Sequence, residues 1–250
     1  MREKLFKILI LSSIYFFVNS LNLSASNAFW TDEFTTFSSR WDWDYNRGTG
    51  YKQLTTVDGV SIVEIGITEQ SSSSGHSDCS LHEKRHQHAY GIFEARLRCV
   101  KGRGFNQLWK GTSGWGFWHW DHDPLKLSAA WFWWASTENN ASLWDFQVMV
   151  ARDSTVVFQK SLPEIDMQQW HIYRVELLPM GTRFLVDGNE VGFTRKRPNR
   201  LQKIEMWIDN SRVQVVDTKV KASGYLDVQQ NQRMYIDWVR YYHGNSDQHR

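Results

Sequence analysis

The feature that most constrains the fold is a succession of short segments in which hydrophobic and polar residues alternate. The side chains of a β-strand point alternately to its two sides, so a period of two predicts strands. The segments with this period cover residues 60–67, 91–100, 115–120, 129–135, 146–150, 171–177, 183–186, 204–208 and 234–241. Turn signals separate them, such as Asp187-Gly188, which predicts a tight hairpin turn. Because no long segment has helical periodicity, the sequence predicts an all-β sandwich or barrel.

Two neighbouring segments, residues 114–120 and 129–135, carry aromatic rings on both sides of the predicted strand. A strand that is apolar on both sides is covered on both sides. In a sandwich of two sheets, one side meets the core, so the other lies under a loop, in a partner interface or in a binding groove. Rows of rings suit sugars, whose C–H faces stack on them while their hydroxyls pair with polar groups. Plain core packing is the alternative interpretation.

The first 28 residues have the pattern of a secretory signal peptide. Three basic residues are followed by the apolar run 8–18, and the small-residue stretch 25–28 follows a polar segment. An uncleaved anchor is the alternative, but the run is shorter than the ~20 residues that a membrane span needs. The sequence therefore predicts a secreted or extracytoplasmic protein whose residues 29–250 form a single domain, with no membrane span in the mature chain. It does not define the oligomeric state.

The charge balance excludes some classes of partner. Residues 1–28 contain three of the 29 Lys and Arg and one of the 27 Asp and Glu, so the remainder has 26 of each and no net charge. Nucleic-acid binding normally needs a basic surplus, so we predict no nucleic-acid partner. The basic run at residues 195–200 is interpreted as a solvated loop. A neutral polysaccharide is the partner that this balance favours.

Export also gives a meaning to the two cysteines of the chain, Cys79 and Cys99. An oxidising compartment allows a disulfide between them. If the chain reverses near Ala89, the two lie opposite each other on an antiparallel hairpin, and a bridge would contribute ~3 kcal/mol. Two free buried thiols are the alternative, and the residues alone do not decide between the two.

Several blocks of the sequence resemble glycoside hydrolase family 16, the family of laminarinases and lichenases. The blocks are WTDEF (30–34), YGIFEARL (90–97), WHIYRVE (170–176) with RFLVDG (183–188), and MYIDWVRYY (234–242). They are similar to the family's W-x-D-E-F, Y-G-x-F-E-A-R, W-H-x-Y-x-x-E with its V-D-G hairpin, and closing M-x-V-D-Y-V-R strand, and they occur in the family's order. The resemblance implies a concanavalin A-like jelly roll, a sandwich of two antiparallel sheets with a concave ligand face.

This chain departs from the catalytic signature of that family. Family members carry E-x-D-x-x-E or E-x-D-x-E on a cleft strand, and retaining hydrolysis needs two carboxyls about 5 Å apart. The segment in the corresponding interval, residues 129–135, holds no carboxylate. The run Glu164-Ile165-Asp166 resembles the motif, but it directly precedes the W-H-x-Y block, and Gln169 stands where the second Glu belongs. We interpret this match as coincidence.

Other polar groups are weaker catalytic or metal candidates. Asp121 and Asp123 follow an aromatic strand and are flanked by His119 and His122, so they could bind a metal or do acid–base work, although a polar turn is the alternative. The histidines at positions 76, 82, 86 and 88 match no zinc spacing and are interpreted as a polar hairpin end. The resemblance implies a structural calcium held by Glu33 and Asp237, and no other cofactor is required.

The sequence thus favours a lectin-like protein that binds a neutral polysaccharide in an aromatic groove. The residues predicted to line this groove are Trp109, Trp115, Phe117, His119, Trp131 and Trp133. A register error of one residue would exchange groove rings for core rings, so the alternates are Trp118, Trp120, Phe132 and Trp134. Two other hypotheses stay open. The first is a glycoside hydrolase or polysaccharide lyase with displaced catalytic residues, and the second is a structural or adhesion module.

Overall fold

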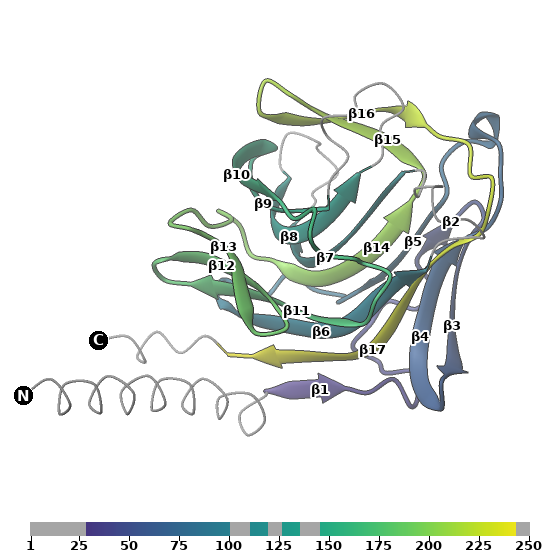
Figure 1. Cartoon of the computed structure of the whole chain (residues 1–250), viewed down its shortest axis with the longest axis horizontal. Coiled ribbons are helices and arrows are strands. Elements are labelled where there is room, and N and C mark those ends of the chain that lie inside the picture. Colours follow the sequence, from purple (N-terminus) through teal and green to yellow (C-terminus); the bar gives the residue numbers. More distant parts are fainter. Residues whose placement is uncertain (1–28, 101–110, 120–126, 136–145, 244–250) are drawn as a thin grey trace, which may run out of the picture.

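The computed structural model describes residues 29–100, 111–119, 127–135 and 146–243. These residues form two antiparallel sheets packed face to face, which confirms the predicted all-β sandwich (Figure 1). The described part contains one short 3₁₀ turn at Ser72–Ser74 and no α-helix. Within it, no helix is long and apolar enough to cross a membrane. The predicted signal peptide, residues 1–28, lies outside the described residues.

The first sheet, called sheet I below, has eight strands and contains the first and last strands of the chain. Its strands, in spatial order, are β13 (Asn189–Thr194), β12 (Gly181–Val186), β11 (His171–Leu178), β6 (Gly91–Val100), β17 (Gln232–Tyr242), β4 (Val60–Ile67) and β3 (Gly50–Val57), with β1 (Trp30–Asp32) paired to β17. The predicted turn at Asp187-Gly188 connects β12 to β13, and both residues have positive φ (50° and 79°), as a tight hairpin turn requires.

The second sheet, sheet II, has nine strands and carries both aromatic segments. Its spatial order is β15 (Ser211–Val216), β16 (Lys219–Tyr225), β10 (Thr155–Ser161), β9 (Gln147–Arg152), β8 (Ser128–Ala135), β7 (Thr112–His119), β14 (Lys203–Asp209), β5 (Asp78–His82) and β2 (Asn46–Arg47). The sheet curves strongly, because its edge strand β15 contacts the central strands β7 and β8 although three other strands separate β15 from β8. Its outer face is therefore concave.

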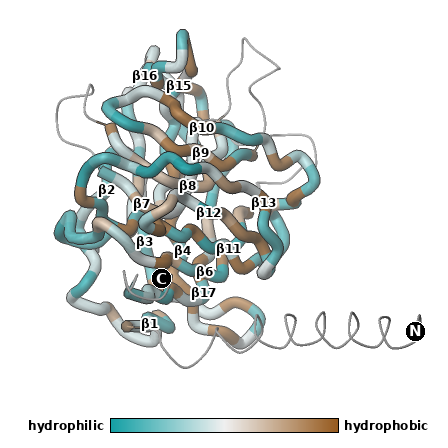
Figure 2. Tube along the Cα trace, turned by 90° about the vertical axis from the view of Figure 1, so that its left-hand side faces the viewer, coloured by the Kyte–Doolittle hydropathy of each residue, from teal (hydrophilic) through white to brown (hydrophobic). Residues whose placement is uncertain are grey.

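The main core lies between the two sheets and follows from the alternation of the strands. On β8, Ala130, Phe132 and Trp134 point into this core, and on β7 the same is true of Trp115 and Phe117. They meet residues of β6, β11 and β12 from sheet I, namely Phe93, Tyr173 and Phe184. Hydrophobic residues recur along the central strands, whereas the marginal loops are largely hydrophilic (Figure 2).

A second hydrophobic cluster covers the outer face of sheet II. Its buried members are Leu127, Ala129, Trp131, Trp133, Ala135, Met149 and Trp207, and half-buried Trp118, Val156, Val213, Val215 and Val220 pack against them. Three of these valines come from the β15–β16 hairpin, residues 211–225, which we call the strap. In Figure 1 the strap lies at the top of the molecule, beyond β7 and β8. The sandwich thus has hydrophobic packing on both sides of sheet II.

The two cysteines do not face each other on a hairpin. Cys79 lies on β5 in sheet II and Cys99 on β6 in sheet I, because the chain crosses from one sheet to the other between these strands. Both thiols are free and buried in the main core. The expected β-hairpin is therefore wrong, and the free-thiol alternative describes the structure.

Candidate functional site

The register of sheet II places its outer-face residues in rows that run across the strands. One row contains His82, Glu205, Gly116, Trp131 and Met149, from β5 through β14, β7 and β8 to β9. The neighbouring row contains Ser80, Trp207, Gly114, Trp133 and Gln147. Lys203 and Trp118 pair at one end of the face, while Asp78, Asp209 and Thr112 lie in line at the other. The polar residues of the face lie on β5 and β14, and its tryptophans lie on β7, β8 and, as Trp207, on β14.

The aromatic half is built from tryptophan rings that contact one another. Trp118 stacks on Trp131 with a centroid distance of 4.6 Å, and Trp207 lies 5.0 Å and 5.2 Å from these two rings. Gly114 on β7 makes room for them, because a Cβ there would lie 2.3 Å from the Trp207 ring. Trp131 and Trp133 are only 2% and 3% exposed, whereas Trp118 is half-buried. Trp118 is thus the member of this cluster that solvent reaches most readily.

The structure corrects part of the predicted groove. Trp131 and Trp133 lie on the outer face as predicted, but Trp115 and Phe117 lie in the main core. The alternation of β7 puts Gly114 and Gly116 on the outer face, so its larger residues face inward.

The remaining predicted residues fall in several places. Of the alternates, Trp118 is on the outer face, whereas Phe132 and Trp134 are in the main core. His119 ends β7, with its Nδ1 2.7 Å from the Leu201 carbonyl oxygen. Four others lie outside the described residues, namely Trp109, Trp120, Asp121 and Asp123.

The polar half is centred on Glu205, a buried carboxyl that sequence reasoning did not single out. Burial raises the pKa of Glu205, and the Lys203 Nζ, 3.4 Å from its Oε2, opposes this shift. Ser80 also forms a hydrogen bond with Glu205. The Ser80 hydroxyl lies 2.7 Å from His82 Nδ1, and His82 Nε2 is 3.5 Å from an Asp42 oxygen. Burial lowers the pKa of His82 to about 4, so its imidazole is neutral at pH 7.

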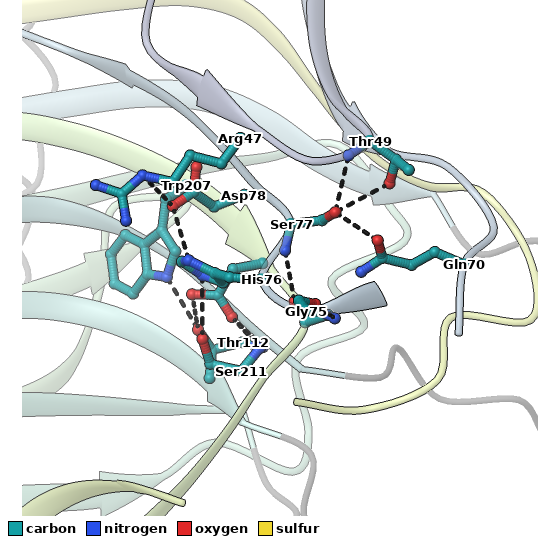
Figure 3. Close-up of polar contacts among 12 residues, drawn as sticks. Arg47, Thr49, Gln70, Gly75, His76, Ser77, Asp78, Thr112, Trp207 and Ser211 are labelled. Atoms are coloured by element: carbon teal, nitrogen blue, oxygen red, sulfur yellow. Dashed lines mark hydrogen bonds and ion pairs between the residues drawn. The ribbon is translucent and has the colours of Figure 1, made fainter. Parts of the chain in front are cut away.

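A second carboxyl pair lies at the other end of the polar half. Asp78 and Asp209 are directly opposite on β5 and β14, and burial raises the pKa of both. The Asp209 carboxylate accepts hydrogen bonds from the Ser211 N–H (2.8 Å) and the Thr112 hydroxyl (2.9 Å). His76 lies 3.5 Å from Asp78 and 3.4 Å from the Ser211 hydroxyl (Figure 3). This group therefore connects sheet II to the base of the strap.

The predicted calcium ligands are engaged with arginines. Asp237 accepts a hydrogen bond from Arg96, and Glu33 lies 3.7 Å from Arg240. Among the described residues, no group of three or more His, Cys, Asp and Glu side chains is arranged to hold a metal. A calcium ion bound through Asp237 would have to displace the Arg96 guanidinium, so these two side chains do not fit a calcium site.

The outer face can therefore supply hydrogen bonds and an aromatic surface. The neutral imidazole of His82 can donate and accept hydrogen bonds, and the Glu205 carboxyl can accept them. A signal for the polar half was present in the sequence, because Glu205 lies in the predicted strand 204–208, and Lys203 and Asp209, which flank that strand, alternate with it. The sequence alone did not show that β14 pairs with β5 on one side and with β7 on the other.

Comparison with known structures defines the fold class. The structure matches glucanases of glycoside hydrolase family 16, although neither a search against models of protein families nor one against curated proteins found a match. The β-glucanase of Bacillus licheniformis aligns with a TM-score of 0.55 and 12% identity, over 88% of this chain and 100% of that one. Comparable values are found for a pseudo β-1,3-glucanase of Mycobacterium tuberculosis, also an immunostimulatory antigen (0.56, 16%, 88% and 100%). A structure reported with endo-acting O-glycanases of the human gut microbiota that initiate mucin breakdown gives 0.57, 14%, 88% and 100%.

Proposed function

We propose that this protein is exported and binds a neutral polysaccharide on the outer face of sheet II, without hydrolysing it. The observation that carries the proposal is the half-buried Trp118, which stacks on Trp131 and pairs across the strands with Lys203. The names of similar structures include glucanases and one pseudo-glucanase, which supports a glycan ligand with or without hydrolysis. The signal-peptide pattern of residues 1–28 supports export.

The contacts that the proposal requires are of the ordinary kind for sugars. The C–H face of a pyranose would stack on the Trp118 ring, and its hydroxyls would pair with Lys203, Glu205 and His82. Lys203 and Glu205 form an ion pair when Glu205 is ionised, so the face offers no uncompensated charge there to an anionic polymer. This is the reason for proposing a neutral sugar.

The test measures retention of the purified protein on insoluble β-glucan, chitin, mannan and alginate. We expect retention on a neutral polymer, and we expect Trp118→Ala to weaken it at least tenfold because the stacking platform is lost. Trp170→Ala is the matched control. Trp170 is also half-buried, but it lies over Arg96 and Arg98 on the outer face of sheet I. Equal retention of the two variants would contradict the proposed site, and no retention on any polymer would support an adhesion module.

Hydrolysis is the second candidate, and the buried Glu205 is the observation that favours it. A carboxyl with a raised pKa on the cleft face has the property of a general acid. Hydrolysis also needs a second carboxyl at a suitable distance. Asp209 lies four residues along the same strand, ~13 Å from Glu205 at the ordinary rise of a strand. Retaining and inverting hydrolysis need carboxyls about 5 Å and 6.5–9.5 Å apart. Release of new sugar ends by wild type but not by Glu205→Gln would establish hydrolysis and overturn the purely lectin-like proposal.

A further inference from the structure

The strap crosses the aromatic half of the outer face. It begins at Ser211, shortly after β14, and its strand β15, the edge strand of sheet II, also contacts β7 and β8. Its far end reaches the beginning of β10, where Lys219 pairs with Thr155. Between these ends, Val213, Val215 and Val220 pack against the outer hydrophobic cluster, to which Trp131 and Trp133 belong. Trp131 and Trp133 are only 2% and 3% exposed with the strap in this position, so lifting it would open a route for a sugar chain toward them.

The base of the strap is held by several side chains and backbone groups. The Leu226 N–H donates to the Asn210 carbonyl (2.8 Å), and the Asn210 side-chain amide donates to the Leu226 and Gly75 carbonyls (3.2 and 3.1 Å). The His76 ring stacks on Tyr225 at 5.1 Å with an interplanar angle of 19°. These contacts fix the base to the segment before β5.

The far end of the strap is attached more sparsely. Its backbone bonds to the sheet there are Val156 N–H to Thr218 O (2.7 Å) and Val220 N–H to Ser154 O (3.2 Å). They flank a single cross-strand pair, Thr155 and Lys219, whose side chains also form a hydrogen bond. The strap is therefore anchored at its base and releasable at its far end.

A donor without a partner lies beneath the strap. The indole N–H of Trp131 is buried and has no hydrogen-bond partner among the residues that the structure describes. An unsatisfied buried donor is unfavourable, so a ligand hydroxyl that accepts a hydrogen bond from it would stabilise the ligand-bound protein. An aromatic surface next to a free donor is suited to a sugar ring, which offers a C–H face and hydroxyl acceptors.

We propose that the strap is a lid that lifts from Thr155 and admits a sugar chain onto Trp131 and Trp133. This inference rests on the proposed polysaccharide-binding function, whose open part is Trp118. The closed strap covers the inner part of the same surface, so binding couples to strap opening. The Trp131 N–H then pairs with a sugar hydroxyl.

The test locks the strap with a disulfide. Thr155 and Lys219 are a non-hydrogen-bonded antiparallel pair, because the backbone bonds flank them, and the close approach of such pairs suits a disulfide. The double variant Thr155→Cys/Lys219→Cys is expected to bind polysaccharide when reduced and at least tenfold more weakly when oxidised. Reduction should restore binding. The matched control is Thr56→Cys/Ser61→Cys, a cross-strand pair between β3 and β4 in sheet I, whose affinity should not depend on the redox state.

Hydrogen exchange measures strap opening without a ligand. The amides of Val156 and Val220 should exchange faster than that of Leu226 in the wild type, and the oxidised lock should slow them. Equal exchange of all three amides would overturn the lid, whatever binds. Equal binding by the locked and reduced forms would also overturn the lid and leave the polysaccharide function standing. A third outcome is that no form binds any polysaccharide while the amides at the far end exchange fast. This outcome would refute the polysaccharide function and, with it, the role of the lid in binding.

Discussion

The outer faces of the two sheets differ in how completely their buried carboxylates are paired with cations. On sheet I, Arg174 lies between Glu94 (3.4 Å) and Glu176 (2.8 Å), and Arg183 lies 2.5 Å from Glu176. Arginines there also cover aromatic rings, as Arg174 covers Tyr242. Each of these carboxylates has a cation beside it, so the charges form an interlocked network.

The outer face of sheet II is less completely neutralised. Burial raises the pKa of Asp78, Glu205 and Asp209, and their nearest cations only oppose this shift in part. Desolvated acids cost stability, and acids of this kind gather at functional sites. The contrast supports the proposal that the outer face of sheet II, rather than that of sheet I, binds a ligand.

The largest effect is expected from removing a ring beneath the strap. Trp131→Ala should lower the free energy of unfolding by about 3–5 kcal/mol, because it empties a buried site. Trp170→Ala on the outer face of sheet I should cost about 1 kcal/mol, since its ring is half-buried. Urea denaturation of both variants measures the difference. Similar losses would show that the outer cluster is not packed as a second core.

The next comparison removes one carboxylate from each outer face. Glu176→Gln should cost about 3 kcal/mol at pH 7, because Arg174 and Arg183 both lose a charged partner. Glu205→Gln should lie within about 1 kcal/mol of wild type or be more stable, because burial disfavours the charge that it removes. Thermal and urea unfolding at one pH provide the measurement. A large loss in Glu205→Gln would mean that this carboxyl is structural, like those of sheet I.

The sequence could predict the sandwich because period-two alternation is a local property that survives in almost every strand. It could not predict which face of β7 points to the core. Gly114 and Gly116 alternate with aromatic residues, so neither face of the strand is clearly the core face. Gly114 faces outward where the Trp207 ring, from a strand far along the chain, occupies the space above it, and a Cβ at Gly116 would meet Ala130 and Trp131 of β8.

The other missed features also depend on long-range pairing. Residues 211–225 lie outside the predicted strands, and their local pattern does not show that the hairpin they form folds back over β7 and β8. The order of β5 beside β14 brings His82 next to Glu205 across more than a hundred residues. The cysteine hairpin failed for the same reason, because consecutive strands joined different sheets.

The smallest effect that sharpens the comparison is a pH dependence from His82. Burial lowers its folded pKa to about 4 from 6.5, so its contribution is fully present above pH 6.5 and is lost as the pH falls toward 4. Between pH 7.5 and pH 5 this loss should reach about 2 kcal/mol. The raised pKa of Glu205 acts in the opposite direction, since its contribution is lost as the pH rises through the folded value. Urea unfolding across this range should therefore show a shallower acid-side loss in His82→Gln and a steeper one in Glu205→Gln. Parallel curves for both variants and wild type would mean that the polar half of sheet II is as well compensated as sheet I.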